Sequence, residues 1–259
     1  MSPVGWLAAD WPAPPGVRAG VTTRVGGIST GPFATLNLAA HVGDDPAAVA
    51  TNRTLLSAAL ALPAEPLWLR QVHGTAVVVH DGAQAHPEAD AAVTFVPGRV
   101  LAVLVADCLP VVIASRDGAR LGLAHAGWRG LAGGVIEATV RELGVAGADL
   151  VAWLGPGIGP AAFEVGAEVR AAFTDRDPAA AEAFAVNPRG RWQADLYRLA
   201  RQRLARLGVQ SVSGGDACTF ADAERFYSYR RNATTGRMAT LAWLVASGDA
   251  AGARATVRA

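Results

Sequence analysis

Two histidines and one cysteine are the residues of this sequence whose types and positions are best suited to chemistry. The chain has only five His and two Cys, and His73, Cys108 and His125 each lie at the end of a segment with the composition of a β-strand. One thiolate and two imidazoles are three of the four ligands of a tetrahedral zinc site, and a free fourth position is typical of catalytic zinc. Taken singly, however, each residue is more often a packed cysteine or a hydrogen-bonded histidine of the scaffold.

A predicted β-hairpin brings two of these side chains together. The dipeptide Asp117-Gly118 favours a two-residue turn between strands. Residues equidistant from that turn lie opposite each other, so His125 faces Pro110, and Cys108 lies two positions farther along its strand. The Cα atoms of Cys108 and His125 are then about 8 Å apart, a gap that two side chains can bridge through one metal ion. No local sequence pattern places His73 near the other two residues.

Composition excludes several classes of protein. Hydrophobic residues make up 51% of the 259 residues and charged residues 17%, which excludes a disordered chain. The formal net charge of +1 disfavours a general nucleic-acid binder. All 23 basic residues are arginines, so Schiff-base lysine chemistry and phosphate loops with a lysine are excluded. The longest aliphatic run, residues 100–106, is far shorter than the ~20 residues of a membrane helix, and no export signal is recognisable, so we expect a cytoplasmic protein without membrane contact.

Hydrophobic patterning predicts a mixed α+β fold. Short apolar runs predict strands over residues 17–24, 67–72, 75–80, 91–96, 100–106, 111–115, 119–124, 149–154 and 237–245. Helices are predicted from Asp45 as N-cap through Leu60, and over residues 130–143 and 194–207. This order indicates mixed β-sheets flanked by helices in a layered sandwich. We expect one domain over residues 1–246 and a small polar tail over residues 247–259.

Several short motifs follow one another along nearly the whole chain. They are LNL at 36–38, HVGDD at 41–45, RQVHG at 70–74, ADCLP at 106–110, HAGWRG at 125–130, GPGIGP at 155–160, FYSYRR at 226–231 and TGR at 235–237. With these motifs the sequence resembles the bacterial YfiH-like proteins, also called the laccase-domain or multicopper polyphenol oxidase family, which are described as purine nucleoside phosphorylases. The resemblance implies that the histidines and the cysteine of the RQVHG, ADCLP and HAGWRG motifs, namely His73, Cys108 and His125, bind zinc.

One departure from the family pattern concerns a second thiol. Relatives often have a cysteine just after the GPGIGP-like motif, where this chain has Ala161 and Ala162. The other cysteine, Cys218, lies in a further recurrent segment, and we expect it to pack against neighbouring residues.

The resemblance implies a zinc-dependent purine nucleoside phosphorylase that acts on adenosine, inosine, guanosine and methylthioadenosine. Because three protein ligands leave a position for water, adenosine deamination is a second expected activity. Candidates for proton transfer are Asp107 and Glu164. Arginine forks match the oxygens of phosphate, and amides can hold ribose or base. The candidate substrate-binding residues are accordingly Asn37, Arg70, Gln71, Arg230 and Arg237.

Three other functions stay open at the level of the sequence. A cysteine hydrolase could use Cys108 as nucleophile on cell-wall precursor peptides. A copper-dependent polyphenol oxidase is disfavoured because five histidines are too few for a multicopper centre, although copper could occupy the zinc ligands. A nucleoside-binding or metal-binding protein without enzymatic activity is the third. The expected partners are a nucleoside and phosphate, and a monomer and a homodimer are both compatible with the sequence.

Overall fold

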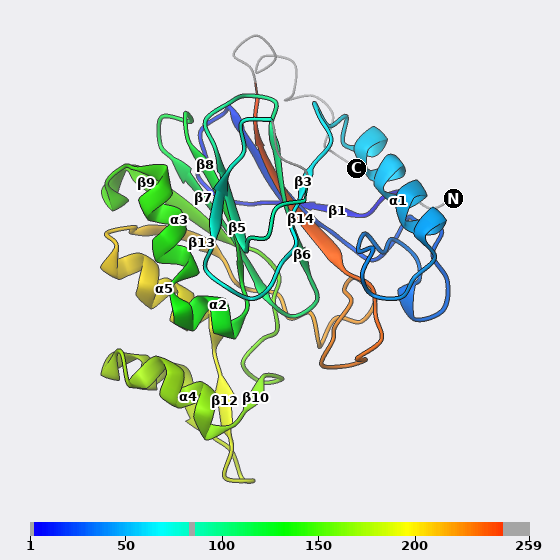
Figure 1. The fold of residues 1–259 in the computed structure, drawn as a ribbon. Coiled ribbons are helices and arrows are strands. Elements are labelled where there is room, and N and C mark those ends of the chain that lie inside the picture. Colours follow the sequence, from blue (N-terminus) through cyan, green and yellow to red (C-terminus); the bar gives the residue numbers. More distant parts are fainter. Residues whose placement is uncertain (1–2, 83–85, 246–259) are drawn as a thin grey trace.

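Two β-sheets packed face to face form the centre of the molecule (Figure 1). The computed structural model describes residues 3–82 and 86–245. The first sheet has five strands in the order β1-β2-β14-β6-β3. Their bounds are Trp6–Ala8 for β1, Val17–Thr22 for β2, Met238–Leu244 for β14, Val100–Val105 for β6 and Leu67–Trp68 for β3.

The second sheet has six strands in the order β13-β9-β7-β8-β5-β4. Their bounds are Ser211–Gly214 for β13, Leu150–Leu154 for β9, Leu109–Ser115 for β7, Leu121–Ala126 for β8, Ala91–Thr94 for β5 and Val77–Val79 for β4. Strands β7 and β8 form an antiparallel hairpin, whereas β13 and β9 are parallel. In the first sheet β3 and β6 are parallel, whereas β14 and β6 are antiparallel. Both large sheets therefore contain parallel and antiparallel pairs.

Apolar side chains on alternate faces of the strands explain why the sheets are covered on both sides. In β6, Val103 points into the core between the two sheets, where Val112 and Leu123 of the second sheet also lie. The neighbouring residues Ala102 and Leu104 of the same strand point into a separate core on the outer face. Since side chains alternate along a strand, a strand with apolar residues at every position needs a packed layer on each face.

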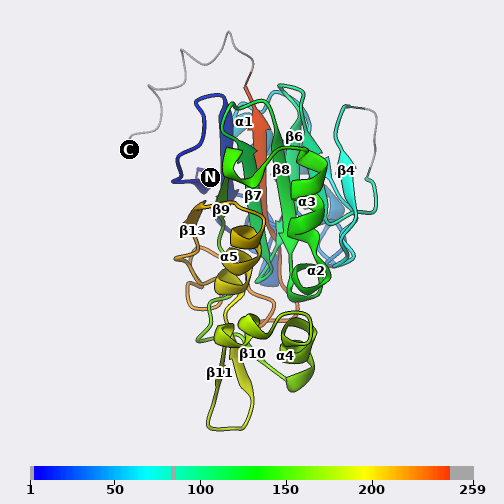
Figure 2. The same cartoon turned by 90° about the vertical axis from the view of Figure 1, so that its left-hand side faces the viewer.

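Helices supply these outer layers. Helix α1 (Pro46–Ala59) begins at the Asp45 N-cap, whose side chain accepts from Ala47 N, and its Leu56 packs on the five-stranded sheet. Helices α2 (Trp128–Gly133), α3 (Val135–Leu143) and α5 (Leu196–Arg206) cover the six-stranded sheet (Figure 2). Short 3-10 helices lie at η1 (Gly31–Phe33), η2 (Gly147–Asp149) and η3 (Pro178–Ala183). The predicted layered α+β fold is confirmed.

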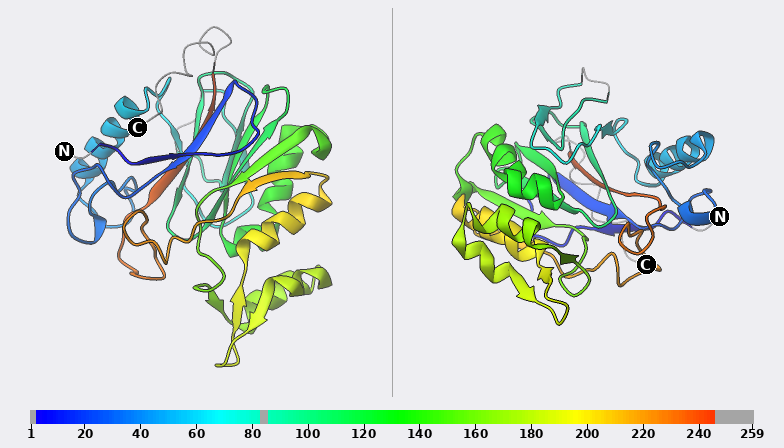
Figure 3. Two further views of the ribbon diagram at one scale, coloured as in Figure 1. Left: turned by 180° about the vertical axis from the view of Figure 1, so that it is seen from behind. Right: turned by 60° about the horizontal axis from the view of Figure 1, so that its bottom comes forward.

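A third, small sheet projects from one end of the sandwich (Figures 2 and 3). It has the order β10-β12-β11, with bounds Glu164–Val165, Trp192–Ala194 and Phe184–Val186, and helix α4 (Ala167–Thr174) lies beside it. The sequence did not predict this lobe, because its strands are only two or three residues long. Its apolar side chains, such as Phe163 and Phe173, join the core that covers the six-stranded sheet.

The hairpin register predicted from Asp117-Gly118 is confirmed, since Pro110 pairs with His125. Three bounds of the hairpin strands differ from the prediction. Strand β7 begins at Leu109, directly after Cys108, whereas β8 begins at Leu121 and extends to Ala126, so His125 lies inside the strand. The predictions of strands over 111–115 and 119–124 were wrong at these ends, because the ladder continues to the Leu109–Ala126 pair.

Other predicted elements are shorter or divided. The predicted helix over 130–143 is two helices, because Gly134 adopts a left-handed φ of 105° between α2 and α3. The predicted strands over 67–72 and 75–80 shrink to β3 and β4. The first ends early because the Val72 amide bonds to the Asp90 carboxylate and not to a neighbouring strand, and His73 follows with a left-handed φ of 62°. Residues 247–259, the predicted polar tail, lie outside the described residues. Within the described part of the chain, none of the helices is long and apolar enough to cross a membrane.

Candidate metal centre

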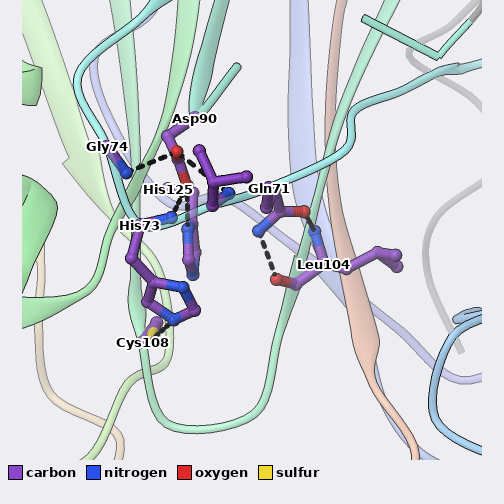
Figure 4. Close-up of polar contacts among 8 residues, drawn as sticks. Gln71, His73, Gly74, Asp90, Leu104, Cys108 and His125 are labelled. Atoms are coloured by element: carbon purple, nitrogen blue, oxygen red, sulfur yellow. Dashed lines mark hydrogen bonds and ion pairs between the residues drawn. The ribbon is translucent and has the colours of Figure 1, made fainter. Parts of the chain in front are cut away.

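Three side chains from different parts of the chain converge at one end of the sandwich. His73, Cys108 and His125 each offer a donor atom, and these atoms lie within 4.8 Å of one another. The Cys108 Sγ and His73 Nε2 atoms are 3.8 Å apart, and the two imidazole centroids are 4.9 Å apart (Figure 4). The structure therefore brings all three candidate ligands together.

The hairpin fixes the positions of Cys108 and His125. The buried ladder holds His125 inside β8, where its side chain is 3% exposed. Cys108 follows Asp107, a non-glycine residue with a left-handed φ of 89°. The Asp107 carboxylate accepts hydrogen bonds from Thr219 Oγ1 at 2.7 Å, Ser228 Oγ at 3.0 Å and Arg230 N at 2.6 Å. These bonds stabilise the turn that points the thiol toward the histidines.

His73 is placed by contacts that no short sequence pattern reveals. The Gln71 side chain pairs with the backbone of β6, accepting from Leu104 N at 2.8 Å and donating to Leu104 O at 2.9 Å. The backbone amides of residues 72–74 donate to the carboxylate of Asp90. Gln71 and Asp90 thus hold the turn on which His73 stands.

The electrostatic character of the group follows from burial and from its neighbours. Burial alone would lower the pKa of His125, but the Cys108 thiolate and the Asp90 carboxylate raise it. Burial alone would raise the pKa of the Cys108 thiol, but the imidazoles of His125 and His73 lower it. Without a metal ion, the arrangement therefore favours a thiolate paired with an imidazolium.

The three donors are close enough to bind one metal ion. Bonds of about 2.3 Å to sulfur and 2.0 Å to nitrogen in a zinc tetrahedron place a sulfur and a nitrogen roughly 3.5 Å apart. The Cys108 Sγ and His73 Nε2 atoms are 3.8 Å apart and all three donors lie within 4.8 Å, so small side-chain rotations would bring them to bonding distance. The His-Cys-His group could hold a metal ion, and a mixed sulfur and nitrogen set suits zinc and copper alike.

A cavity of about 450 Å³ opens beside the three donors. This volume is in the range of sites for small molecules. One part of its wall is apolar and consists of Leu104, Ala106, Trp128, Ile158, Phe163 and Leu196. Cationic or basic side chains contribute another part, namely His41, Arg129, Arg230 and Arg237. Gln71, Asp107 and Tyr229 complete the lining together with the three candidate ligands.

Two of the three arginines predicted to bind phosphate line the cavity. Arg237 donates through Nη1 to the carbonyls of Thr235 and Gly236 at 2.8 and 3.0 Å. Burial lowers the pKa of this guanidinium, although the charges of Cys108 and Asp107 act in the opposite direction. Arg230 donates to the carbonyl of Glu164 at 2.9 Å. Each guanidinium is thus fixed by backbone carbonyls while it faces the cavity.

The third arginine lies elsewhere. Arg70 forms an ion pair with Glu88, and its side chain is 70% exposed. It is absent from the residues that line the cavity. Its neighbour Gln71 does line the cavity, but both ends of its amide already bond to the backbone of Leu104.

Asn37, predicted to bind substrate, is fully buried behind the cavity. Its Oδ1 accepts from the backbone nitrogens of Arg237 at 2.9 Å and Ala39 at 3.1 Å. Its Nδ2 donates to Asp44 at 2.9 Å. These contacts make Asn37 a support for Arg237.

The two predicted proton carriers have different surroundings. Asp107 lines the cavity next to Cys108. The Glu164 carboxylate lies outside the lining and binds Asn187 and Arg189, which hold its pKa below the usual range. A catalytic role of either carboxyl group stays a prediction.

Sequence reasoning did not single out several residues that the cavity contains. His41, Trp128, Arg129 and Tyr229 line it, and all four lie inside the HVGDD, HAGWRG and FYSYRR motifs that were recognised. The buried Asp90 was also overlooked. Its signal was a charged residue directly before a short, mostly apolar strand, which predicts a buried carboxylate with specific partners.

The comparisons with known proteins show the family and the fold of this chain. The sequence profile described as "Multi-copper polyphenol oxidoreductase laccase" matches residues 18–245. The chain belongs to this laccase-like family. Among its curated relatives is a purine nucleoside phosphorylase of Pseudomonas aeruginosa, 55% identical over 241 residues that cover 92% of this chain and 98% of the relative. The purine nucleoside phosphorylase YfiH of Escherichia coli is 50% identical over 240 residues, with the same coverage of 92% and 98%.

Solved structures of the laccase-like family show the same fold. A Neisseria meningitidis protein superimposes with a TM-score of 0.90 at 46% identity, covering 93% of this chain and 100% of the other. YlmD of Geobacillus stearothermophilus superimposes with a TM-score of 0.86 at 34% identity, covering 95% and 98%. The recognition of the family from sequence motifs is therefore confirmed.

Proposed function

We propose that this laccase-like protein is a zinc-dependent purine nucleoside phosphorylase. Its proposed substrates are adenosine, inosine, guanosine and methylthioadenosine, and adenosine deamination is a second proposed activity. The observation that carries the proposal is the convergence of His73, Cys108 and His125 on a cavity that also contains Arg230 and Arg237. The names of the curated relatives support the same reaction.

Phosphorolysis transfers the ribosyl group from the purine to phosphate. A phosphate oxygen forms a bond to C1′ of the ribose while the bond from C1′ to N9 breaks, and its electron pair goes to the departing purine. The purine takes up a proton, and the products are the free base and ribose 1-phosphate. Arg237 and Arg230 are proposed to bind the phosphate through charge-assisted hydrogen bonds. The apolar wall of Trp128, Ile158 and Phe163 supports a purine ring held away from water.

His73, Cys108 and His125 are proposed to hold the zinc ion at the edge of this cavity. A bound zinc ion supplies a Lewis acid that can polarise a substrate atom, and for deamination it can activate the water that replaces the 6-amino group of adenosine, releasing ammonia. Asp107 lines the cavity and is the better placed of the two proposed proton carriers. Gln71 and Asn37 are proposed to contribute to substrate binding indirectly. Gln71 fixes the His73 turn on β6, and Asn37 fixes the backbone of Arg237.

A product assay combined with metal analysis tests the proposal. Purified protein is incubated with each of the four nucleosides with and without phosphate, and the products are separated. From adenosine we expect adenine and ribose 1-phosphate only with phosphate and inosine without it, and we expect one zinc ion per chain that is lost in Cys108→Ala. Zinc-containing protein that turns over none of the four nucleosides would contradict the proposal and favour a nucleoside-binding or metal-binding role.

A cysteine hydrolase is a second candidate because of one specific arrangement. The Asp90 carboxylate orients His125, and the other side of that imidazole faces Cys108, which is the order of a nucleophile, a base and an orienting acid. If this reading holds, zinc-free protein hydrolyses cell-wall precursor peptides and loses that activity when Cys108 is alkylated. A phenolic substrate with added copper tests the oxidase alternative in the same assay series. Oligomeric state and location in the cytoplasm stay predictions.

A further inference from the structure

We propose that Asp90 is a positioning residue that sets the orientation of both histidine ligands through one buried carboxylate. The inference rests on the proposed role of His73, Cys108 and His125 in holding zinc. Asp90 directly precedes β5, and its exposed fraction is 0%. Figure 4 shows its carboxylate between the backbone of the His73 turn and the ring of His125.

The first set of contacts holds the turn that carries His73. The backbone amides of Val72, His73 and Gly74 donate to the Asp90 oxygens at 3.2, 2.9 and 2.6 Å. Successive amides aimed at one anion form a nest, a backbone arrangement that binds negative charge. His73 has a φ of 62°, which non-glycine residues seldom adopt. The carboxylate therefore stabilises the unusual backbone that projects this ring toward Cys108.

The second set of contacts holds His125. Its Nδ1 lies 2.8 Å from Asp90 Oδ1, and its backbone nitrogen donates to the Asp90 carbonyl at 2.7 Å. A hydrogen on Nδ1 is required for the first bond, because an ionised carboxylate can only accept. The lone pair of Nε2 is then left to bind a metal ion, and the ring cannot rotate away without losing the Nδ1 bond.

A single oxygen atom connects the two ligands. Asp90 Oδ1 accepts from both His73 N and His125 Nδ1. Asparagine has the same size but only one oxygen. With that oxygen at the Oδ1 position the amide hydrogens face Val72 N and Gly74 N, and in the other orientation they face His73 N and His125 Nδ1. Asp90→Asn therefore preserves volume while it leaves two of the four donors without an acceptor in either orientation. Asp90→Glu is unsuitable because a fully buried site has no room for a further methylene group.

Zinc affinity separates positioning from general support of the fold. Dissociation constants are measured by competition with a chelator for the wild type, Asp90→Asn, His125→Ala and the double variant. Asp117→Asn is the matched control, because Asp117 accepts from Ser115 Oγ and Ala119 N at the opposite end of the same hairpin. Circular dichroism confirms that each variant is folded.

We expect Asp90→Asn to raise the zinc dissociation constant about 10- to 100-fold and Asp117→Asn to change it less than about twofold. In the His125→Ala background, the effect of Asp90→Asn should shrink at least about threefold, because the contribution through the ring is already lost. A folded Asp90→Asn protein with wild-type affinity, or an equal loss in both backgrounds, would overturn the inference while the proposed function stands. Wild-type protein that binds no zinc through Cys108 would overturn both.

A measurement without substitution covers the case in which Asp90→Asn does not fold. Nitrogen-15 NMR of the zinc-loaded wild type reports which imidazole nitrogen of His125 carries hydrogen. We expect hydrogen on Nδ1 and the metal on Nε2. The opposite assignment would contradict the role of Asp90.

Discussion

The two sides of the cavity are built in different ways. Of the three candidate metal ligands, His125 lies inside the β7–β8 hairpin and Cys108 directly precedes it, and the ladder of this hairpin is buried from end to end. Arg230 and Arg237 lie on the long connection between β13 and β14 and are held by backbone carbonyls. A metal site requires ligand positions accurate to a fraction of an ångström, whereas long guanidinium side chains can adjust to an anion. The six-stranded sheet thus fixes the positions of the metal ligands, and the connection between β13 and β14 provides positively charged side chains.

This difference predicts separate effects for the two sides. Changes at the hairpin side should act through metal occupancy, and changes at the arginine side should act through the Michaelis constant for phosphate. The following predictions are in order of decreasing expected effect.

Removal of the sulfur ligand should give the largest effect. Cys108→Ala is expected to weaken zinc binding more than about 100-fold, because a direct ligand contributes more than an outer-shell partner. The rate of phosphorolysis should fall by a similar factor. Cys218→Ala is the matched control, since its Sγ accepts from Gly159 N at 3.2 Å and it lies outside the cavity lining. Zinc content and initial rates are measured for both variants. Equal losses of zinc in the two variants would contradict the assignment of Cys108 as the sulfur ligand.

Loss of the half-buried Arg237 side chain should raise the Michaelis constant for phosphate. Arg237→Ala is expected to raise it about 10- to 100-fold with full zinc content, because a hydrogen bond to a charged group contributes roughly 1.5–3 kcal/mol. Arg70→Ala should change it no more than about twofold, since Arg70 pairs with Glu88 on the surface. Steady-state kinetics at varied phosphate check the pair. A larger effect from Arg70 would place the phosphate outside the cavity.

A single methyl group should disturb the hairpin side more mildly. A Cβ atom at Gly127 would lie 2.9 Å from Cys108 Sγ and 3.1 Å from His73 Cδ2. The backbone there, with φ −61° and ψ 160°, accepts alanine, so the effect is steric. We expect Gly127→Ala to weaken zinc binding about 3- to 10-fold. Gly16→Ala is the control, because apart from its chain neighbours its Cβ would approach no atom closer than 3.9 Å. Unchanged affinity in Gly127→Ala would show that the ligands can move freely.

The smallest expected effect is a shift in the pH dependence of thiol reactivity. In zinc-free protein the imidazoles of His125 and His73 lower the pKa of Cys108, so the thiolate should persist to lower pH than an ordinary thiol with a pKa of about 8.5. Alkylation of Cys108 by iodoacetamide, followed by mass spectrometry between pH 5 and 9, should have a midpoint below that value. The midpoint should move upward in His125→Ala. An alkylation midpoint near pH 8.5 in the wild type would contradict the thiolate–imidazolium pair.

The parts of the fold that depend on local patterns were predictable, and the hairpin is the clearest case. Asp117-Gly118 gave the correct register, which placed His125 opposite Pro110. Gly134 shows the limit of such patterns, because a continuous apolar stripe concealed a left-handed residue between two helices. The small lobe was not predictable from its two- and three-residue strands.

The site depended more on contacts between distant residues. The position of His73 requires Gln71 to bond to Leu104 and the turn amides to bond to Asp90, and no spacing rule connects these residues. The arginines show the same limit, since Arg70 and Arg237 are alike in type but one faces solvent and the other lies beside the thiol. Family motifs supplied these residues as candidates, and only the tertiary structure distinguishes their surroundings.

The small lobe of β10, β11, β12 and α4 has a consequence for how substrate choice can diversify. It meets the cavity through the ring of Phe163, and it holds Arg230 through the carbonyl of Glu164. The lobe shares a core with the helices on the six-stranded sheet, but its strands pair with neither large sheet, so its outer face can accept substitutions while the two sheets stay intact. We therefore expect natural variation in base preference to accumulate in this lobe, with the hairpin under much stronger selection.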